Sequence, residues 1–258
     1  MTIAGSDSGG GAGIQADLKS FAAMGVYGTS VITAITAQNT LHVTHVLDLP
    51  TELIEAQIDA VLSDIGTDAV KIGMLSSSDI IEVVAEKVRE YDLSNLVVDP
   101  VMVAKGGDRL LRDDAVDTLR TVLLPLALVV TPNVPEAEVL SGRAIRSIDD
   151  VRDAARGIVS MGAKAVVVKG GHLEGPATDI LYDGEQFQAF TSQRIKTNNN
   201  HGSGCTFASA TAASLAKGMS LRDAVGEAKK FVTATMRHAF PIGRGHGPLN
   251  HFYQLRGS

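Results

Sequence analysis

The sequence predicts an α/β fold in which a mainly parallel central sheet is flanked by helices on both faces. Short apolar runs rich in β-branched residues alternate with longer segments in which apolar residues fall three and four apart. That alternation is typical of βαβ units. The chain has 258 residues, of which 45% are hydrophobic and 20% charged, a balance that fits one packed domain. We therefore expect residues 1–258 to form a single domain.

The strands and helices can be placed along the chain by their periodicity. The apolar, β-branched runs predict strands at 2–4, 30–35, 69–72, 96–99, 128–131 and 165–169. The amphipathic segments predict helices at 14–24, 51–65, 79–91, 113–124, 135–140, 148–161, 206–217 and 221–239. Two of these helices begin with Ser-x-x-Asp, at Ser147 and Ser220, which is a capping pattern. Residues 179–182 and 187–191, joined by an Asp-Gly turn, predict a late β-hairpin.

Composition and charge exclude several classes of function. The net charge is −6, and the 23 Lys and Arg residues form no basic block, so nucleic acid is not an expected partner. The single cysteine, Cys205, excludes an intramolecular disulfide and a multi-cysteine zinc site, and is compatible with a reducing compartment. No apolar run reaches the length of a membrane span, and the chain does not begin with a signal-peptide pattern. We expect a cytoplasmic protein with no membrane partner.

Two glycine-rich segments are candidates for ligand binding. Residues 5–13 contain five glycines and follow the first expected strand, but neither the dinucleotide-binding nor the P-loop glycine spacing occurs. Residues 201–206, His-Gly-Ser-Gly-Cys-Thr, run into a helix of small residues. Converging backbone N–H groups and the helix dipole would suit an anion there. Glycine serves turns as readily as ligands, so for the first segment both interpretations stay open.

Cys205 can be interpreted in two ways. A thiol at a helix start can have a lowered pKa, which makes Cys205 a candidate base or electrostatic contact. A lone cysteine beside small residues is more often a buried packing residue. The neighbouring glycines favour the functional interpretation.

Polar residues follow three of the expected strands, where ligands bind in open α/β sheets. Asp99 ends one strand, Asn133 and Glu136 follow another, and Lys169 ends a third. Oxygen ligands of this kind suit Mg²⁺, which bridges phosphates. Each residue alone could be a turn former, a helix cap or a surface charge, but their joint placement predicts a common cleft.

Two further residues that follow strands could bind a flat heterocycle. Gln38 would supply an amide edge and Met74 an apolar face, although either could be an ordinary loop or core residue. His42 and His45 are spaced like alternate residues of a strand, but no carboxylate or cysteine lies near them in the sequence. We therefore expect no metal site at this histidine pair.

In combination these motifs resemble the hydroxymethylpyrimidine and hydroxymethylpyrimidine-phosphate kinases of thiamine biosynthesis, which belong to the ribokinase-like superfamily. The resemblance covers almost the whole chain. It rests on residues 4–8 (AGSDS), 10–19 (GGAGIQADLK), 31–34 with 37–40 (VITA, AQNT), 71–75 (KIGML), 99–102 (DPVM), 131–133 (TPN), 169–172 (KGGH) and 245–248 (GHGP). The chain departs from the family at Gly9, where Ser is usual, and at Ser203, where Thr is usual.

The resemblance implies a ribokinase-like domain that uses ATP and Mg²⁺ to phosphorylate hydroxymethylpyrimidine and then its phosphate. It implies that the pyrimidine is bound by Gly5, Asp17, Gln38, Met74 and Val101, with Gln38 on the aminopyrimidine edge. It also implies that Gly202, Ser203, Gly204 and Cys205 form an anion hole. Cys205 would take the place that the aspartate base occupies in the sugar kinases.

On the nucleotide side, the resemblance implies that Asn133 and Glu136 lie near Mg²⁺ and the ATP phosphates, together with Lys169. Asp99 would be a second acid on the metal side. Residues 105–108 resemble a mobile flap over the phosphates, and members of this family are commonly homodimers.

Two other functions remain open from the sequence. A pyridoxal kinase is the nearest alternative, because related kinases with cysteine at this position are also reported to phosphorylate pyridoxine-type alcohols. A non-catalytic sensor of pyrimidine or nucleotide is an alternative of another class. The presence of Asp99, Glu136, Lys169 and Cys205 argues against such a sensor.

Overall fold

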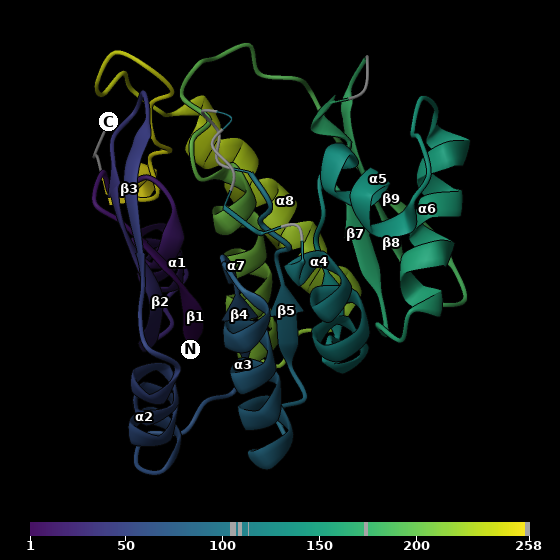
Figure 1. The fold of residues 1–258 in the computed structure, drawn as a ribbon. Helices are drawn as coiled ribbons and strands as arrows, with labels where there is room; N and C mark the ends of the chain where they lie inside the picture. Colours follow the sequence, from purple (N-terminus) through teal and green to yellow (C-terminus); the bar gives the residue numbers. More distant parts are fainter. Residues whose placement is uncertain (104–106, 108–109, 113, 173–174, 256–258) are drawn as a thin grey trace.

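A single nine-stranded sheet organises the molecule (Figure 1). The computed structural model describes residues 1–103, 107, 110–112, 114–172 and 175–255. In this part of the chain the strand order is β3-β2-β1-β4-β5-β6-β7-β8-β9. The strands are β1 (Thr2–Asp7), β2 (Ser30–Gln38), β3 (Val43–Asp48), β4 (Val70–Ile72), β5 (Leu96–Val98), β6 (Val129–Val130), β7 (Val166–Val168), β8 (Ala177–Tyr182) and β9 (Phe187–Ser192).

Six neighbouring strands are parallel, and antiparallel strands close the sheet at both edges. β2, β1, β4, β5, β6 and β7 run in the same direction. β3 pairs antiparallel with β2 at one edge, and β8 and β9 form a hairpin at the other. The predicted α/β class, the mainly parallel sheet and the late hairpin are confirmed.

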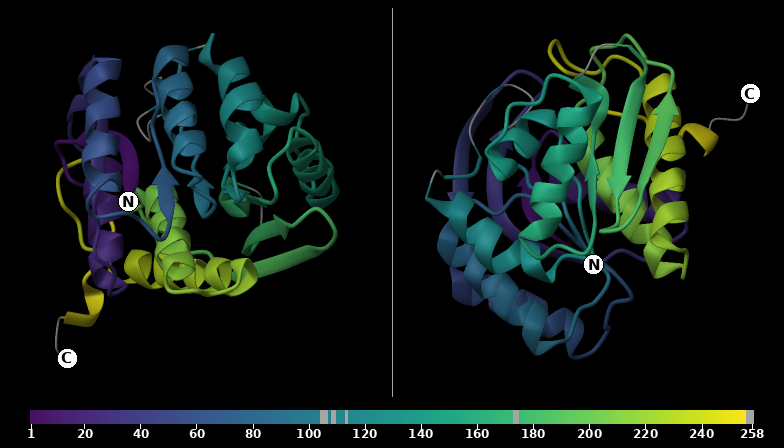
Figure 2. Two further views of the ribbon diagram at one scale, coloured as in Figure 1. Left: turned by 90° about the horizontal axis from the view of Figure 1, so that it is seen from below. Right: turned by 90° about the vertical axis from the view of Figure 1, so that its right-hand side faces the viewer.

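Helices cover both faces of the sheet (Figure 2). Ile54, Ile81 and Ile158 belong to one buried apolar cluster, whereas Phe207 and Phe231 belong to a second. The first cluster lies under α2 (Thr51–Leu62), α3 (Ser78–Glu90), α4 (Ala115–Thr118), α5 (Val134–Ser141) and α6 (Ile148–Ser160). The second lies under α1 (Gly13–Ala23), α7 (Ser203–Ala216) and α8 (Leu221–Arg237). These two apolar layers hold the sheet between them, as expected for a parallel sheet.

The structure differs from the sequence prediction at the edge strand β3. Its residues are mostly exposed. Its sequence, Val-Thr-His-Val-Leu-Asp, also lacks the strict alternation of apolar and polar residues that marks a half-buried strand. β1 and β2 also extend further than predicted, to Asp7 and Gln38, which places these two polar residues at strand ends.

The helix predicted at 113–124 is divided into shorter pieces. α4 continues into a π-helical turn at Leu119–Leu123 and a 3-10 turn at Leu124–Leu126. Pro125 lies in the last turn and has no N–H to donate, so a regular helix ends there. Of the flap predicted at 105–108, only Gly107 lies within the described residues. Within that part of the chain, no helix has the length and apolar character needed to cross a membrane.

Candidate active site

A cavity of about 580 Å³ lies where the ends of the parallel strands meet the first turns of α5 and α7. Both glycine-rich segments and all three polar strand ends contribute to its wall. Twelve of the thirteen predicted site residues line it: Gly5, Gln38, Met74, Asp99, Val101, Asn133, Glu136, Lys169, Gly202, Ser203, Gly204 and Cys205. The cavity therefore brings together residues that the sequence separates by up to two hundred positions.

The two glycine-rich segments pack backbone against backbone at one end of this cavity. Gly202 is the N-cap of α7 and has a positive φ of 79°. A Cβ atom there would lie 1.8 Å from the carbonyl oxygen of Gly11, and one on Gly13 would lie 2.4 Å from that of Gly5. Only glycine allows these approaches. Glycine is therefore required at Gly202 by the packing of the two loops on each other, and at Gly13 by the close approach of the first loop to its own strand.

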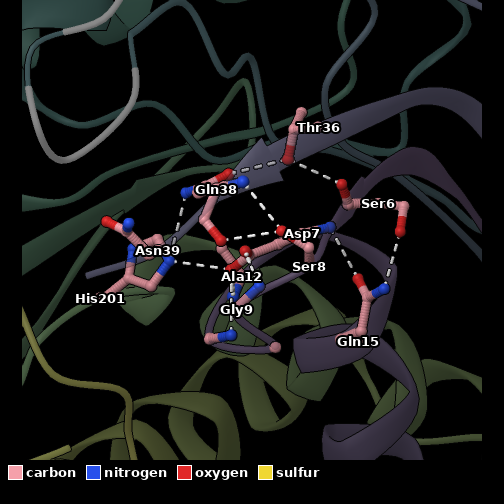
Figure 3. Close-up of polar contacts among 12 residues, drawn as sticks. Ser6, Asp7, Ser8, Gly9, Ala12, Gln15, Thr36, Gln38, Asn39 and His201 are labelled. Atoms are coloured by element: carbon pink, nitrogen blue, oxygen red, sulfur yellow. Dashed lines mark hydrogen bonds and ion pairs between the residues drawn. The ribbon is translucent and has the colours of Figure 1, made fainter. Parts of the chain in front are cut away.

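A polar cluster joins the two glycine segments to the end of β2 (Figure 3). His201 Nε2 lies 2.9 Å from Asp7 Oδ2 and 3.3 Å from the side-chain nitrogen of Gln38. The Asp7 carboxylate also accepts backbone hydrogen bonds from Gly9 and Ala12, each 2.8 Å long. Burial raises the pKa of Asp7, but the hydrogen bonds from His201 and the backbone outweigh burial and lower it. Asp7 is therefore a carboxylate that fixes both loops.

A second charged cluster lies beside the start of α7. Lys169 Nζ donates to Asp99 Oδ1 over 2.8 Å. Burial lowers the pKa of Lys169, but the charges of Asp99 and Glu136 outweigh it and raise the pKa above its usual value. A Cβ on Gly204 would lie 3.2 Å from Lys169 Nζ and 3.3 Å from Asp99 Oδ2. The ion pair is therefore held directly against the backbone of the anion loop, residues Gly202–Cys205.

Glu136 has a structural role and also faces the cavity. It forms a capping box with Asn133 at the start of α5, with two reciprocal hydrogen bonds of 2.8 and 2.9 Å. Burial raises the pKa of Glu136 to about 7; Lys169 opposes this shift and Asp99 adds to it. A carboxylate so poorly solvated is suited to a cation, which would compensate its charge.

The donor set fits Mg²⁺ held mainly by phosphates and water. Among the described residues there is no group of three or more His, Cys, Asp or Glu side chains that could hold a metal ion. Mg²⁺ usually binds one or two carboxylates and keeps several waters while it bridges phosphates. Asp99 and Glu136 can supply those one or two carboxylates.

The expected low pKa of Cys205 is wrong. Burial raises the pKa of its thiol to about 11, because the opposing charge of Lys71 is offset by the negative charges of Asp17 and Asp99. The hydrogen bond that the sulfur accepts from the backbone N–H of Gly13 lowers the pKa only in part. At neutral pH Cys205 is therefore a neutral thiol in this cavity, because the helix start does not compensate for desolvation.

Asp17 is the one predicted site residue that does not line the cavity. It is fully buried, and its carboxylate accepts hydrogen bonds from Thr2 (2.7 Å), Lys71 (2.9 Å) and Ser209 (2.6 Å). These partners lie on β1, β4 and α7. Asp17 therefore links three elements beneath the site, and its oxygens are satisfied without a ligand.

The sequence did not assign roles to several residues that the structure brings to the cavity. Asp7 and His201 were both inside the glycine motifs, and their position next to glycines was the only signal. Asp179 and Lys229 form a second buried ion pair at the cavity, 2.8 Å long, with burial raising the pKa of Asp179. No sequence spacing connects a hairpin residue with a residue of α8, so this pair could not have been found.

A sequence model of one family, described as phosphomethylpyrimidine kinase, matches residues 7–250. The chain belongs to the phosphomethylpyrimidine kinase family. Its fold is ribokinase-like. The family match covers every predicted site residue except Gly5.

Two curated relatives and one solved structure illustrate the similarity. The hydroxymethylpyrimidine/phosphomethylpyrimidine kinase of Bacillus subtilis is 52% identical, and the alignment covers 100% of this chain and 96% of that protein. The thiamine biosynthesis bifunctional protein ThiED of Geobacter sulfurreducens is 54% identical over 97% of this chain, which spans 51% of that longer protein. An ADP complex of Bacillus subtilis pyridoxal kinase superposes with a TM-score of 0.92 at 44% identity, covering 99% of this chain and 98% of the other.

The buried pair of Asp17 and Lys71 gives a prediction for stability. Lys71→Met should lower the free energy of unfolding by about 3–5 kcal/mol, because it leaves the Asp17 charge buried without its cation. The double variant Asp17→Asn with Lys71→Met should recover part of that loss. Urea denaturation followed by circular dichroism measures both values. A double variant less stable than Lys71→Met alone would contradict this account.

The raised pKa of Cys205 predicts how its thiol reacts. Since Cys205 is the only cysteine in the chain, alkylation by iodoacetamide reports on it alone. The rate should be low at pH 7 and should rise about tenfold per pH unit up to at least pH 10, because only the thiolate reacts. Mass spectrometry of timed samples in the ligand-free protein measures this rate. A plateau below pH 9 would show that the thiol ionises near its ordinary pKa.

Proposed function

We propose that this protein catalyses the ATP-dependent phosphorylation of 4-amino-5-hydroxymethyl-2-methylpyrimidine and of its monophosphate, in thiamine biosynthesis. The observation that carries the proposal is that one cavity is lined both by Gln38 and Met74 and by the glycine loop Gly202–Cys205 with the three polar strand ends. Membership of the phosphomethylpyrimidine kinase family supports the same activity. The B. subtilis relative that aligns over the full chain carries both kinase activities in its name.

The pyrimidine ring would lie at the end formed by β1, β2 and the loop after β4. Gly5 lies close to Met74, where a Cβ would come within 3.0 Å of the Met74 sulfur. Met74 therefore packs directly on the backbone of β1, and the two residues line an apolar slot of the cavity for a flat ring. Gln38, at the edge of this slot, can donate one hydrogen bond and accept another, as an aminopyrimidine edge requires. Val101 would close the slot from the side of β5.

The phosphoryl group would be transferred at the anion loop. The first backbone N–H groups of α7 have no partner within the helix, and they can donate to an oxyanion. Lys169 adds a positive charge beside Gly204, held in place by Asp99. The attacking hydroxyl would lie near Cys205, whose neutral thiol can donate a weak hydrogen bond or pack against the methylene group. Positioning and electrostatics thus supply most of the catalysis, as is general for phosphoryl transfer.

On the nucleotide side, Asn133, Glu136 and Lys169 would bind the ATP phosphates. Asp99 and Glu136 would hold Mg²⁺, which when bound neutralises charge between the β- and γ-phosphates. The capping box keeps the Glu136 carboxylate at the cavity wall without a bound ligand. We further propose a single kinase domain over residues 1–258, assembly as a homodimer and a cytoplasmic location.

Pyridoxal phosphorylation is the second candidate activity. It is favoured by the structural similarity to B. subtilis pyridoxal kinase, and the cavity itself is large enough for either ring. The hydrogen-bonding edge of Gln38 favours the aminopyrimidine, because pyridoxal presents a phenolic oxygen and an aldehyde instead of a ring nitrogen beside an amino group. A sensor without turnover would not need the buried Asp99–Lys169 pair beside the anion loop.

The activity can be tested by ADP release from Mg-ATP in the presence of either alcohol. We expect a kcat/KM for the hydroxymethylpyrimidine more than about tenfold above that for pyridoxal. In Gln38→Ala the KM for the pyrimidine should rise about tenfold or more, because a buried hydrogen-bond match worth about 1–3 kcal/mol is lost. The KM for ATP should not change.

Gln188→Ala is the matched control, since Gln188 lies on β9 and does not line the cavity. It should leave both KM values unchanged. An unchanged pyrimidine KM in Gln38→Ala would show that the ring binds elsewhere. Turnover of pyridoxal alone would replace the proposed substrate by the second candidate.

The roles of the loop backbone and of the thiol can be separated. Gly204→Ala should lower kcat by about 100-fold or more, because the new methyl group displaces the Asp99–Lys169 pair from the anion loop. Cys205→Ser should keep kcat within about tenfold, since a neutral thiol contributes little as a base. Gly157→Ala, in α6, is the control, because its Cβ meets nothing closer than 3.8 Å. A larger loss of kcat in Cys205→Ser than in Gly204→Ala would instead indicate that Cys205 is the general base.

A further inference from the structure

Protons in the Asp7–His201 cluster are fixed by the hydrogen bonds of Asp7. Asp7 Oδ2 accepts from the backbone N–H groups of Gly11 (3.0 Å) and Ala12 (2.8 Å), and it lies 2.9 Å from His201 Nε2. A carboxylate with these partners can only accept. His201 must therefore carry a proton on Nε2, the nitrogen that faces Asp7. This conclusion holds whether or not the other ring nitrogen is protonated.

The side-chain amide of Gln38 lies between His201 and Thr36. Its amide nitrogen, a donor, lies 3.3 Å from His201 Nε2, which is also a donor. Its amide oxygen lies 3.2 Å from Thr36 Oγ1. That hydroxyl gives its one proton to the carbonyl oxygen of Ser6, 2.9 Å away. Two donors therefore meet on one side of the amide and two acceptors on the other.

A half-turn of the amide converts both contacts into hydrogen bonds. The Gln38 oxygen would then be the second, weaker acceptor of the one His201 Nε2 proton, which it would share with Asp7 Oδ2 in a three-centre hydrogen bond, and the Gln38 nitrogen would donate to Thr36 Oγ1. Each amide atom would still have one free position directed at the cavity, a lone pair on the oxygen and a proton on the nitrogen. No change of backbone or of any neighbouring side chain is needed.

We propose that Asp7, His201 and Thr36 are positioning residues that hold the Gln38 amide with its oxygen toward His201 and its nitrogen toward Thr36 when the pyrimidine binds. The direction of the amide then decides which heterocycle edge fits and which way round the ring lies. This inference rests on the proposed function, since it concerns how the same cavity reads a pyrimidine.

The orientation that follows for the ring agrees with the position of the anion loop. An acceptor on the His201 side pairs with the amino group of the pyrimidine, and a donor on the Thr36 side pairs with the ring nitrogen. The hydroxymethyl group is bonded to the carbon beyond the amino group. It therefore lies further toward the His201 side, where Gly202–Cys205 follow directly in the chain. The opposite amide orientation would turn the hydroxyl away from the phosphoryl group.

His201 also packs on the first glycine loop, so a purely structural role must be separated from this one. A Cβ on Gly11 would lie 2.3 Å from the His201 ring, which means that the ring itself fills this space. Loss of the ring would loosen the loops and lower affinity for any ligand. The general effect cancels in the ratio of the affinities of one variant for two ligands that differ only in their hydrogen-bonding edge. That ratio reports the direction of the Gln38 amide alone.

The test compares two ligands of the same shape with opposite hydrogen-bonding edges. These are 4-amino-5-hydroxymethyl-2-methylpyrimidine and its 4-oxo counterpart, in which a ring N–H and a carbonyl replace the ring nitrogen and the amino group. Calorimetry without ATP gives the dissociation constant of each. The wild-type protein should bind the amino compound about 100-fold more tightly, because the oxo compound opposes like groups at both amide atoms.

In His201→Phe the ratio should fall at least tenfold. The phenyl ring keeps the packing on Gly11 but has no N–H, so the amide can turn to fit the oxo compound. Thr36→Val, which keeps the branched shape of the β2 residue, should lower the ratio in the same direction by removing the other anchor. Thr36→Ser is the matched control and should keep the wild-type ratio, since it retains the hydroxyl.

The measured affinity ratios test the positioning role separately from the proposed function. Equal ratios in the wild type, His201→Phe and Thr36→Val would overturn the positioning role while leaving the proposed function intact. If His201→Phe does not fold, the pair Thr36→Val and Thr36→Ser decides alone. Wild-type protein that binds neither pyrimidine would overturn the proposed function, and with it this inference.

Discussion

The arrangement of the whole site depends on the contact between two backbone loops. Gly202 of one loop approaches the carbonyl oxygen of Gly11 in the other to a distance that no side chain would permit, and Gly11 leaves room for the ring of His201. The Asp7 carboxylate, which accepts from its own loop and faces His201 of the other, holds the contact together. Because one loop ends β1 and the other begins α7, this contact fixes the heterocycle end of the cavity relative to its anion end.

Buried ion pairs then set the electrostatic character of the anion end. Lys169 is compensated by Asp99, and Lys71 by Asp17 deeper in the protein. Each ammonium group is thus kept charged in a poorly solvated place, where its field is strong. Burial raises the pKa of the Cys205 thiol, and the negative charges of Asp17 and Asp99 offset the opposing charge of Lys71. In the proposed reaction, the lysines would therefore stabilise incoming phosphate charge, while Cys205 would stay a neutral thiol.

The fold and most of the site could be predicted from the sequence because strands buried on both faces leave a strong apolar signal. Residues that directly follow such strands, like Asp99 and Lys169, are brought together by the topology alone. The edge strand β3 has no buried face and gave no signal. Asp17 was misplaced because membership of a motif does not tell which way a helical side chain points, and in α1 it points into the core. His201 was overlooked because its partner, Asp7, lies 194 positions away.

Specificity in this cavity can be concentrated in very few atoms. Gly5, Met74 and Val101 offer an apolar slot, and such contacts discriminate poorly between flat rings of similar size, by about 10–200-fold per methylene at most. A buried amide discriminates more strongly, but only when neighbours prevent it from rotating, since a free amide can present either atom. The protein meets that condition because backbone N–H groups of the first glycine loop donate to the Asp7 carboxylate, which in turn accepts from His201 and so fixes the position of the His201 proton. The carboxylate that joins the two loops therefore also determines the side on which the His201 proton is presented to Gln38, so loop packing and substrate recognition depend on the same group.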